Sequence, residues 1–133
     1  GIKRRTGDLQ GHDAMNESEH QQALIQWVKA HQVKYPQLGC LFSIPNGGYR
    51  SARTAGTMKA EGVKSGVWDL FLPVPMGHSC GLFVEMKVGK GRLSPAQHEF
   101  RAMVGESYTW AVCYSWHEAV RDIVNYLGLD IQV

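Results

Sequence analysis

Two carboxylates and one lysine lie in two neighbouring apolar segments of the chain, where charged side chains are not expected. Asp69 lies in the run 66–72, and Glu85 and Lys87 lie in the next run, 82–88. Burial of a carboxylate is unfavourable unless a cation or hydrogen bonds compensate for the lost hydration. The simplest explanation is a metal ion held by carboxylate oxygens, next to a lysine that contacts a phosphate or a water molecule.

A pair of strands would bring these three side chains together. Side chains alternate along a strand, so Glu85 and Lys87 are expected on the same face. Asp69 belongs to the preceding run, and side chains on neighbouring strands are about 5 Å apart. Carboxylate and carbonyl oxygens favour Mg²⁺ or Mn²⁺ over zinc. The alternative is a structural ion pair between Lys87 and one of the carboxylates, which is common on half-exposed strands.

The composition indicates one soluble globular domain. The chain has 133 residues, 44% of them hydrophobic and 20% charged, which is enough for a core of its own. It has no run of about 18 apolar residues, so we expect no membrane span. Residues 1–15 are expected to form a flexible basic arm and not a secretory signal, because no apolar stretch follows the basic cluster. A single domain is expected over residues 16–133.

The charge is unevenly distributed along the chain. Residues 50–92 contain seven Lys or Arg and three Asp or Glu, a net charge of +4, so the rest of the chain carries −2. A positive zone around an acidic site suits a polyanion whose phosphates must approach carboxylates. The alternative is solvated loop charge with no partner.

The three cysteines indicate an intracellular protein. Cys40, Cys80 and Cys113 are far apart and show no C-x-x-C spacing. The odd number and the spacing argue against a disulfide framework and against a zinc site. All three are expected to be buried, reduced thiols.

The pattern of apolar residues and breakers predicts a sheet that carries helices. The expected elements are a helix over 17–31, a strand over 40–44, a short helix over 52–61, strands over 67–74 and 80–88, a helix over 95–104, a strand over 108–114 and a helix that ends at residue 127. The short link between the strands 67–74 and 80–88 favours an antiparallel pair. Ser94, Pro95 and Gln97 form a capping-box pattern at a helix start. The predicted class is α/β, with a mixed central sheet flanked by helices.

Five segments together carry a resemblance to a known family. Asp69 and Glu85-Met86-Lys87 follow the D…E-x-K pattern, and four flanking segments accompany it: SEHQ at 18–21, IPNGG at 44–48, GVKSGVWD at 62–69 and LSPAQ at 93–97. In order and spacing, the chain resembles stand-alone VRR-NUC domains of the bacteriophage and bacterial type, within the PD-(D/E)XK nuclease superfamily. Trp68 departs from the proline that the superfamily name implies, although VRR-NUC members vary there.

The resemblance implies a restriction-endonuclease-like αβββαβ core and a metal-dependent nuclease. The implied activity is Mg²⁺- or Mn²⁺-dependent hydrolysis of phosphodiester bonds in branched DNA, above all four-way (Holliday) junctions, by a homodimer in a bacterial or phage-infected cell. The implied roles are Asp69 and Glu85 as direct metal ligands, the carbonyl of Met86 as a third ligand, Glu19 as an acid that reaches the metal, Lys87 as the catalytic lysine, and Gln97 as a support of the site or a contact to the scissile phosphate.

Several of these roles have alternatives. Glu19 is also placed to complete a capping box with Asn16, and periodicity does not decide between Glu17 and Glu19 as the helical acid. Gln97 is likewise a capping-box residue, and the two roles are compatible. Asn46 lies in a turn, where asparagine is expected in any case.

DNA contacts are expected near the site. The candidates are Asn46, Arg50, Arg53, Lys64, Lys90 and Arg92. Contacts to phosphates position a protein on DNA without reading bases. Two other functions stay open at this point: a non-catalytic module that binds DNA junctions, and a sequence-specific restriction or nicking endonuclease on the same core.

Overall fold

The computed structural model describes residues 14–45 and 52–133, without the side chains of Ala52 and Arg53. Its elements in chain order are α1 (Glu17–His31), the 3-10 helix η2 (Pro36–Cys40), β1 (Phe42–Ser43), α2 (Ala52–Ala60), β2 (Leu70–Leu72), β3 (Leu82–Met86), α3 (Pro95–Val104), β4 (Thr109–Cys113) and α4 (Trp116–Leu127). The predicted α/β class and order of elements are confirmed. The predicted arm lies almost entirely outside the described residues. No helix in the described ranges is long and apolar enough to cross a membrane.

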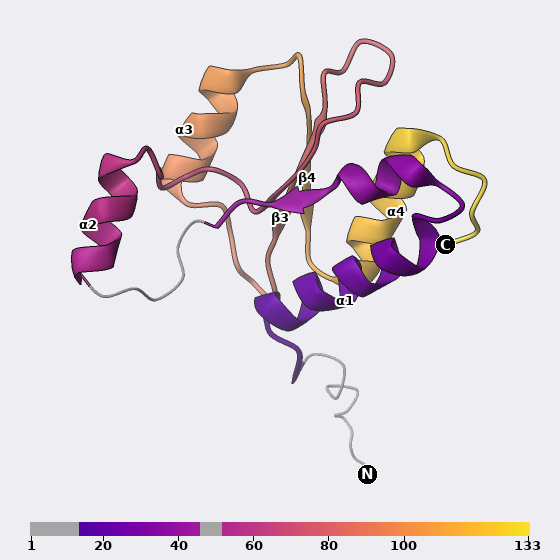
Figure 1. Ribbon diagram of the computed structural model, residues 1–133, viewed down its shortest axis with the longest axis horizontal. Helices are drawn as coiled ribbons and strands as arrows, with labels where there is room; N and C mark the ends of the chain where they lie inside the picture. The colour runs from indigo at the N-terminus through magenta and orange to yellow at the C-terminus, as the bar shows by residue number, and fades with distance from the viewer. Residues whose placement is uncertain (1–13, 46–51) are drawn as a thin grey trace. The chain divides into compact units, whose positions relative to one another are not determined.

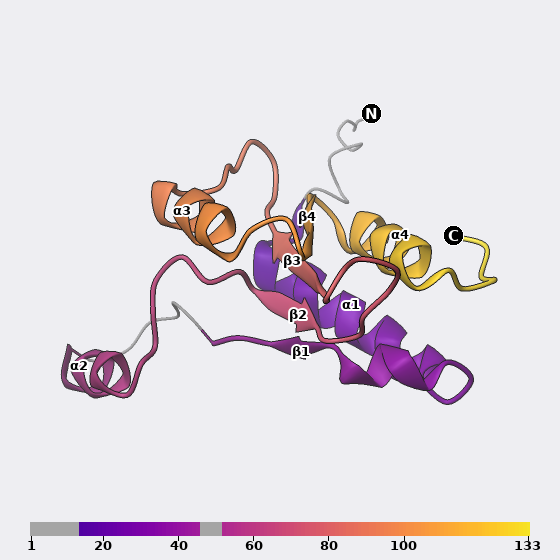
Figure 2. The same ribbon diagram turned by 90° about the horizontal axis from the view of Figure 1, so that it is seen from above.

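The four strands form one mixed sheet in the order β1-β2-β3-β4. β2 pairs with both of its neighbours in the antiparallel direction, as predicted for β2 and β3, and Leu70 lies opposite Val84. Figure 2 shows β1, β2 and β3 in this order. Towards β4, the amide of Cys80 donates to Ser107 O and the amide of Thr109 donates to Gly81 O. These bonds advance in the same direction along both segments, which is the parallel pattern.

The described chain divides into two compact units. The helix-pair unit contains residues up to 39, 86–91 and 112–133; the sheet unit contains 40–85 and 92–111. The chain passes from one unit to the other within β3, after Glu85, and within β4, after Ala111. The single domain expected over residues 16–133 stays a prediction.

In the helix-pair unit, α1 packs against α4 (Figure 1). Leu24 and Val28 of α1 are buried, as are the apolar residues of α4 that recur at helical spacing, such as Val120 and Ile123. His20 is also buried, and its Nδ1 accepts a hydrogen bond of 3.1 Å from the amide of Trp116. This bond requires the proton of the neutral ring to be on Nε2. A histidine in the core therefore fixes the start of α4 on α1.

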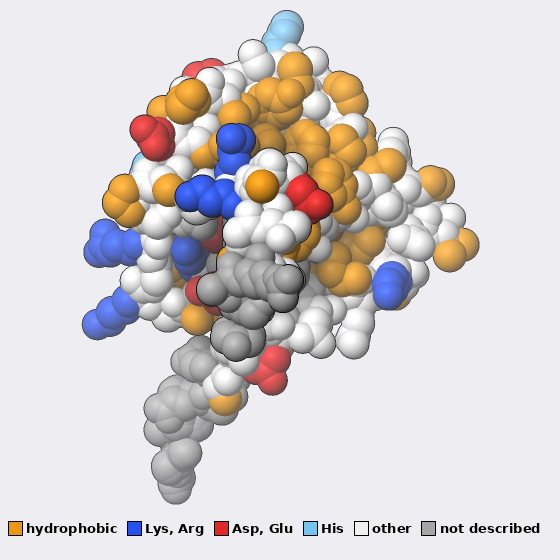
Figure 3. All heavy atoms as spheres, turned by 60° about the vertical axis from the view of Figure 1, so that its left-hand side comes forward, with side chains coloured by type: hydrophobic (Ala, Val, Ile, Leu, Met, Phe, Trp, Pro, Cys, Tyr) orange, Lys and Arg blue, Asp and Glu red, His pale blue; other side chains and the backbone are white. Residues whose placement is uncertain are grey.

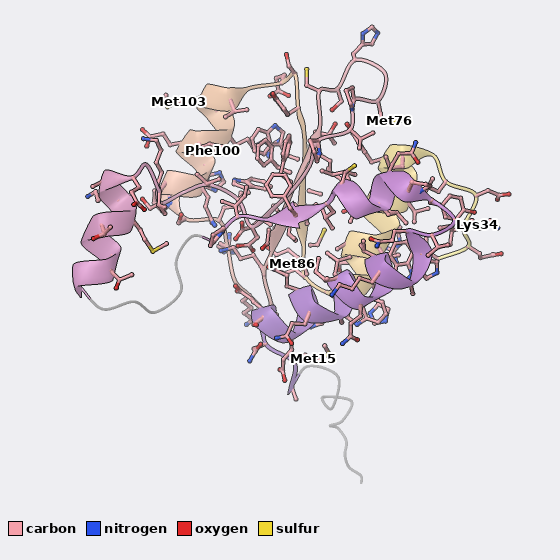
Figure 4. The ribbon with its side chains drawn as sticks, in the orientation of Figure 1. Met15, Lys34, Met76, Met86, Phe100 and Met103 are labelled. Atoms are coloured by element: carbon pink, nitrogen blue, oxygen red, sulfur yellow. The ribbon has the colours of Figure 1, made fainter. Side chains whose placement is uncertain are left out.

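In the sheet unit, a cluster of aromatic rings joins β2, β3, β4 and α3. Phe83 stacks on Phe71 at 4.4 Å and on Trp110 at 4.6 Å between ring centroids, and it meets Phe100 of α3 edge to face at 5.6 Å. Figure 4 labels Phe100 at this cluster, whereas Met103 of the same helix is 81% exposed. Every residue of β3 is buried. Both faces of this strand are therefore covered, which is typical of the inner strands of an α/β sheet.

Three local predictions differ from the structure. The strand expected over 40–44 is shorter, because the chain winds into η2 up to Cys40 and only Phe42–Ser43 pairs with β2. Cys113 is buried, but Cys40 and Cys80 are exposed, so the expectation of three buried thiols is wrong for two of them. A capping box of Ser115 and Glu118 is also predicted from the sequence at the start of α4. Ser115 Oγ accepts from the amide of Glu118, but the Glu118 carboxylate accepts from the amide of Tyr114. In a capping box the Glu118 carboxylate would accept from the amide of the N-cap residue, Ser115; here it accepts from the residue before it.

Candidate active site

Asp69 and Glu85 are neighbours across β2 and β3 in the sheet unit. The register pairs Leu70 with Val84, so one further step places Asp69 opposite Glu85. The amide of Asp69 donates a hydrogen bond of 2.9 Å to Oε1 of Glu85. The carbonyl of Asp69 accepts one of 2.7 Å from the amide of Ile44, beside β1. Both backbone groups of Asp69 are therefore held, and the predicted proximity of the two acids is confirmed.

The carboxylate of Glu85 is deeply buried and is held at both oxygens. Its exposed fraction is 2%. Oε1 accepts from the Asp69 amide, and Oε2 accepts a hydrogen bond of 2.8 Å from Nε2 of Gln97. Hydrogen bonds to an ionised acceptor are short and strong, and they offset part of the cost of burying the charge.

Gln97 connects the start of α3 to this carboxylate. Its Oε1 accepts a hydrogen bond of 2.8 Å from the amide of Ser94, and its own amide donates to Ser94 Oγ at 3.1 Å. Because the Ser94 amide is a donor, the oxygen of the Gln97 side chain must face it, and the NH₂ group must face Glu85. The capping role and the contact to Glu85, predicted as compatible, occur together.

The segment before Asp69 lies directly on the first turn of α3. The indole Nε1 of Trp68, which is fully buried, donates a hydrogen bond of 3.2 Å to Gln97 O. Gly66 has φ +92°, and a Cβ placed there would lie 2.6 Å from Ala96 O. These two contacts were not predicted from the sequence. The available signal was a glycine and a tryptophan shortly before Asp69.

Lys87 belongs to the helix-pair unit, as does Met86. The amide of Lys87 donates a hydrogen bond of 2.9 Å to Cys113 O, and its side chain is half-buried. A Cβ placed at Gly91 would lie 3.6 Å from both Cβ and Cδ of Lys87, so the aliphatic stem runs beside that glycine. The hydroxyl of Tyr114 donates to Gly91 O at 3.0 Å. The loop after Lys87 is therefore tied to the end of β4.

Glu19, also in the helix-pair unit, forms the predicted capping box. Its Oε1 accepts a hydrogen bond of 2.9 Å from the amide of Asn16, and the Asn16 side chain accepts one of 2.8 Å from the amide of Glu19. The structure thus shows the capping role. The role of Glu19 as a metal-reaching acid stays a prediction, and Glu17 lies in the same first turn.

The DNA-contact candidates are only partly described. Asn46 and Arg50 lie outside the described residues, and Arg53 lies in α2 with its side chain not described. Lys64 and Arg92 of the sheet unit and Lys90 of the helix-pair unit are exposed. Figure 3 shows several Lys and Arg side chains standing out on the face that it presents. Exposure of the three described cations is compatible with phosphate contacts.

The donor set suits a hard divalent cation and not zinc. Within the ranges 14–45 and 52–133, no group of three or more His, Cys, Asp or Glu side chains could hold a metal ion. Asp69 and Glu85 form a pair of carboxylates. Magnesium is commonly bound by one or two carboxylates, with water and substrate phosphates completing the shell. The two carboxylates of Asp69 and Glu85 fit that mode.

An α/β fold that holds Asp69, just before β2, against the carboxylate of Glu85 in β3 is the kind of scaffold that nuclease-type domains use. The family model of the VRR-NUC domain matches residues 15–116, and the chain belongs to this family. It is also similar to a solved structure described as "VRR_NUC domain protein", with 27% identity and a TM-score of 0.71 over 86% of this chain and 89% of the other. No curated protein matches the sequence. VRR-NUC domains are generally divalent-metal-dependent nucleases, so the chain contains a nuclease-type DNA-processing domain.

Proposed function

We propose that this VRR-NUC domain is a Mg²⁺- or Mn²⁺-dependent endonuclease that hydrolyses phosphodiester bonds in branched DNA, chiefly four-way junctions, as a homodimer. The observation that carries the proposal is the Asp69–Glu85 pair, joined by a hydrogen bond of 2.9 Å and supported by Gln97. Glu85 is buried, and its carboxylate contacts the backbone of a second acid, Asp69. Carboxylate oxygens from two adjacent segments are the kind of ligand that Mg²⁺ or Mn²⁺ prefers.

The metal would be held by the carboxylates of Asp69 and Glu85 and by the carbonyl of Met86. When bound, a divalent cation polarises a phosphoryl oxygen and lowers the pKa of a coordinated water. Asp69 and Glu85 orient that chemistry because the backbone of Asp69 and both oxygens of Glu85 are fixed by hydrogen bonds. We assign Glu19 as a further acid from the family resemblance.

Lys87 is assigned as the catalytic lysine. It follows Glu85 by two residues, which is the E-x-K spacing. An ammonium group next to the scissile phosphate neutralises developing negative charge and orients the attacking water.

The DNA backbone would be bound by basic side chains that flank the site residues in the sequence. Exposed cationic side chains can contact the phosphate groups of DNA. The candidates whose side chains are described are Lys64, Lys90 and Arg92, and all three are exposed. Asn46, Arg50 and Arg53 are further candidates for phosphate contacts, from the sequence alone. Such binding weakens as salt is raised, because each phosphate contact releases counterions.

Cleavage of matched substrates tests the activity. Four-way junction, flap and linear duplex DNA of the same arm sequences are incubated with the protein in Mg²⁺, Mn²⁺ or EDTA. The proposal predicts metal-dependent cutting with the junction preferred. Junction binding without cutting in any metal would instead indicate a non-catalytic binding module. Cutting of linear duplex at one sequence would indicate a restriction or nicking enzyme.

The homodimer is tested by sedimentation. A dimer at micromolar concentration, and paired cuts on opposite strands of one junction, are expected. A monomer under the same conditions would contradict the paired-cut arrangement while leaving hydrolysis at one site intact.

A further inference from the structure

We propose that Trp68 is a positioning residue of the nuclease site, which fixes the geometry of the two carboxylates through the first turn of α3. The inference rests on the proposed function, in which Asp69 and Glu85 hold the metal. Trp68 itself contacts neither substrate nor metal in this account. Its effect passes through Gln97.

The indole of Trp68 makes a directional contact in a fully buried position. Its exposed fraction is 0%, and its Nε1 donates to the backbone carbonyl of Gln97 at 3.2 Å. Trp110 packs against it edge to face, with 4.9 Å between ring centroids. A buried indole N–H is a donor only, so it needs this acceptor. The ring therefore sets the distance between the Asp69 segment and α3.

Four residues close a ring of contacts around the carboxylates. Trp68 bonds to Gln97 O, the Gln97 side chain bonds to Glu85 Oε2, and Glu85 Oε1 bonds to the amide of Asp69. The peptide bond between Trp68 and Asp69 completes the ring. Because each member is held by two others, a shift of the first turn of α3 displaces Glu85 relative to Asp69.

Gly66 gives independent evidence that this segment is seated on α3. Any Cβ there would approach Ala96 O to 2.6 Å, which no real side chain tolerates without movement of the backbone. Contact of glycine with the helix backbone brings the chain close enough for Trp68 to reach the next carbonyl. Proline, the residue implied by the superfamily name, has no side-chain donor. The hydrogen bond to Gln97 O therefore depends on a tryptophan at position 68.

The chain contains a matched control for the loss of this bond. Trp110 belongs to the same ring cluster, and its Nε1 also donates to a backbone carbonyl, that of Gly105, at 3.1 Å. Gly105 caps the far end of α3, whereas Gln97 lies in the first turn. Trp68→Phe and Trp110→Phe each remove one indole N–H and keep an aromatic ring. Only the first variant loosens the end of α3 that holds Glu85.

The test measures Mn²⁺ binding without DNA, by electron paramagnetic resonance, together with thermal unfolding by circular dichroism. Removal of a group that supports metal ligands typically weakens metal affinity by about 10- to 100-fold. We expect the Kd of Mn²⁺ to rise at least about tenfold in Trp68→Phe and to stay within about twofold of wild type in Trp110→Phe. Both variants are expected to lose thermal stability. Equal Mn²⁺ affinity in Trp68→Phe and wild type would overturn the inference.

A second pair of variants covers the case in which Trp68→Phe does not fold. Gly66→Ala forces the segment away from Ala96, whereas Gly62→Ala carries a similar positive φ with no atom within 4 Å of the added Cβ. Weaker Mn²⁺ binding is expected for Gly66→Ala only, and equal binding in the two variants would overturn the inference.

Asp69→Asn separates the two proposals. If wild type and Asp69→Asn bind Mn²⁺ alike, the metal site itself is wrong; if they differ, only the role of Trp68 is at stake.

Discussion

The side chain of Gln97 donates a hydrogen bond of 2.8 Å to the buried carboxylate of Glu85 while its oxygen caps the start of α3. One side chain thus serves both helix initiation and the candidate site. The two functions use different atoms, Oε1 for the cap and Nε2 for the carboxylate, so mutations can separate them.

Replacement of Gln97 by Ala should reduce the cleavage rate strongly, because Gln97 supports the Glu85 carboxylate. The variant removes the donor to Glu85 Oε2, and a loss of about 10- to 100-fold in activity is expected for a ligand-supporting group. Ser94→Ala is the control, because its backbone amide still donates to Gln97 Oε1. That variant should lose about 0.5–2 kcal/mol of stability but cleave within about twofold of wild type. Equal cleavage defects in the two variants would contradict the account.

Glu19→Gln tests the helical acid. Glutamine also serves in a capping box, so the bond to the Asn16 amide and the stability of α1 should be kept. If Glu19 contributes its charge to the metal, cleavage should fall at least about tenfold. Wild-type activity in Glu19→Gln would limit this residue to its capping role, and Glu17→Gln would then be the next variant to measure.

Lys87→Met should greatly slow cleavage while Mn²⁺ binding is kept. Methionine keeps an apolar stem beside Gly91 and removes the ammonium group. A loss of about 10²–10⁴-fold in the single-turnover cleavage rate is expected for a group of this kind. Lys90→Met is the comparison, because Lys90 is assigned only to phosphate binding. Lys90→Met should weaken DNA binding and reduce the slope of log binding constant against log salt concentration by about one. The single-turnover cleavage rate of bound DNA should not change. A rate defect of the same size in both variants would argue against a catalytic Lys87.

The thiols should differ in reactivity and in their effect on stability. Burial raises the pKa of Cys113 well above its usual range, aided by the hydrogen bond to Asp122 Oδ2 at 3.3 Å and by the charges of Asp122 and Glu118. The folded thiol keeps its proton while the unfolded thiol ionises above about pH 8.5. Stability from this group is therefore complete below that pH and is lost as the pH rises. In native protein, a thiol reagent should modify Cys40 and Cys80 but not Cys113. Rapid labelling of all three would contradict the buried position.

Local sequence signals predicted the helices well. Asn16 with Glu19, and Ser94 with Gln97, are short-range patterns whose partners lie three residues apart, so the capping bonds follow from the sequence. The strand predicted over 40–44 was too long, because a short apolar run does not distinguish a strand from a helical turn, and its first residue belongs to η2. The acid pair was predicted from strand alternation and spacing. The link from Trp68 to Gln97 was not, since its acceptor is a backbone carbonyl, which every residue carries.

The most direct test of the central claim is the cleavage rate of a labelled four-way junction as Mg²⁺ is raised from zero, for wild type and Asp69→Asn. Asparagine keeps the backbone amide that bonds to Glu85, so the variant removes the charge and spares that contact. We predict no cutting in EDTA, cutting by wild type that rises with Mg²⁺ and then saturates, and no cutting by Asp69→Asn at any concentration. Cutting in EDTA, or a wild-type rate in Asp69→Asn, would contradict the central claim.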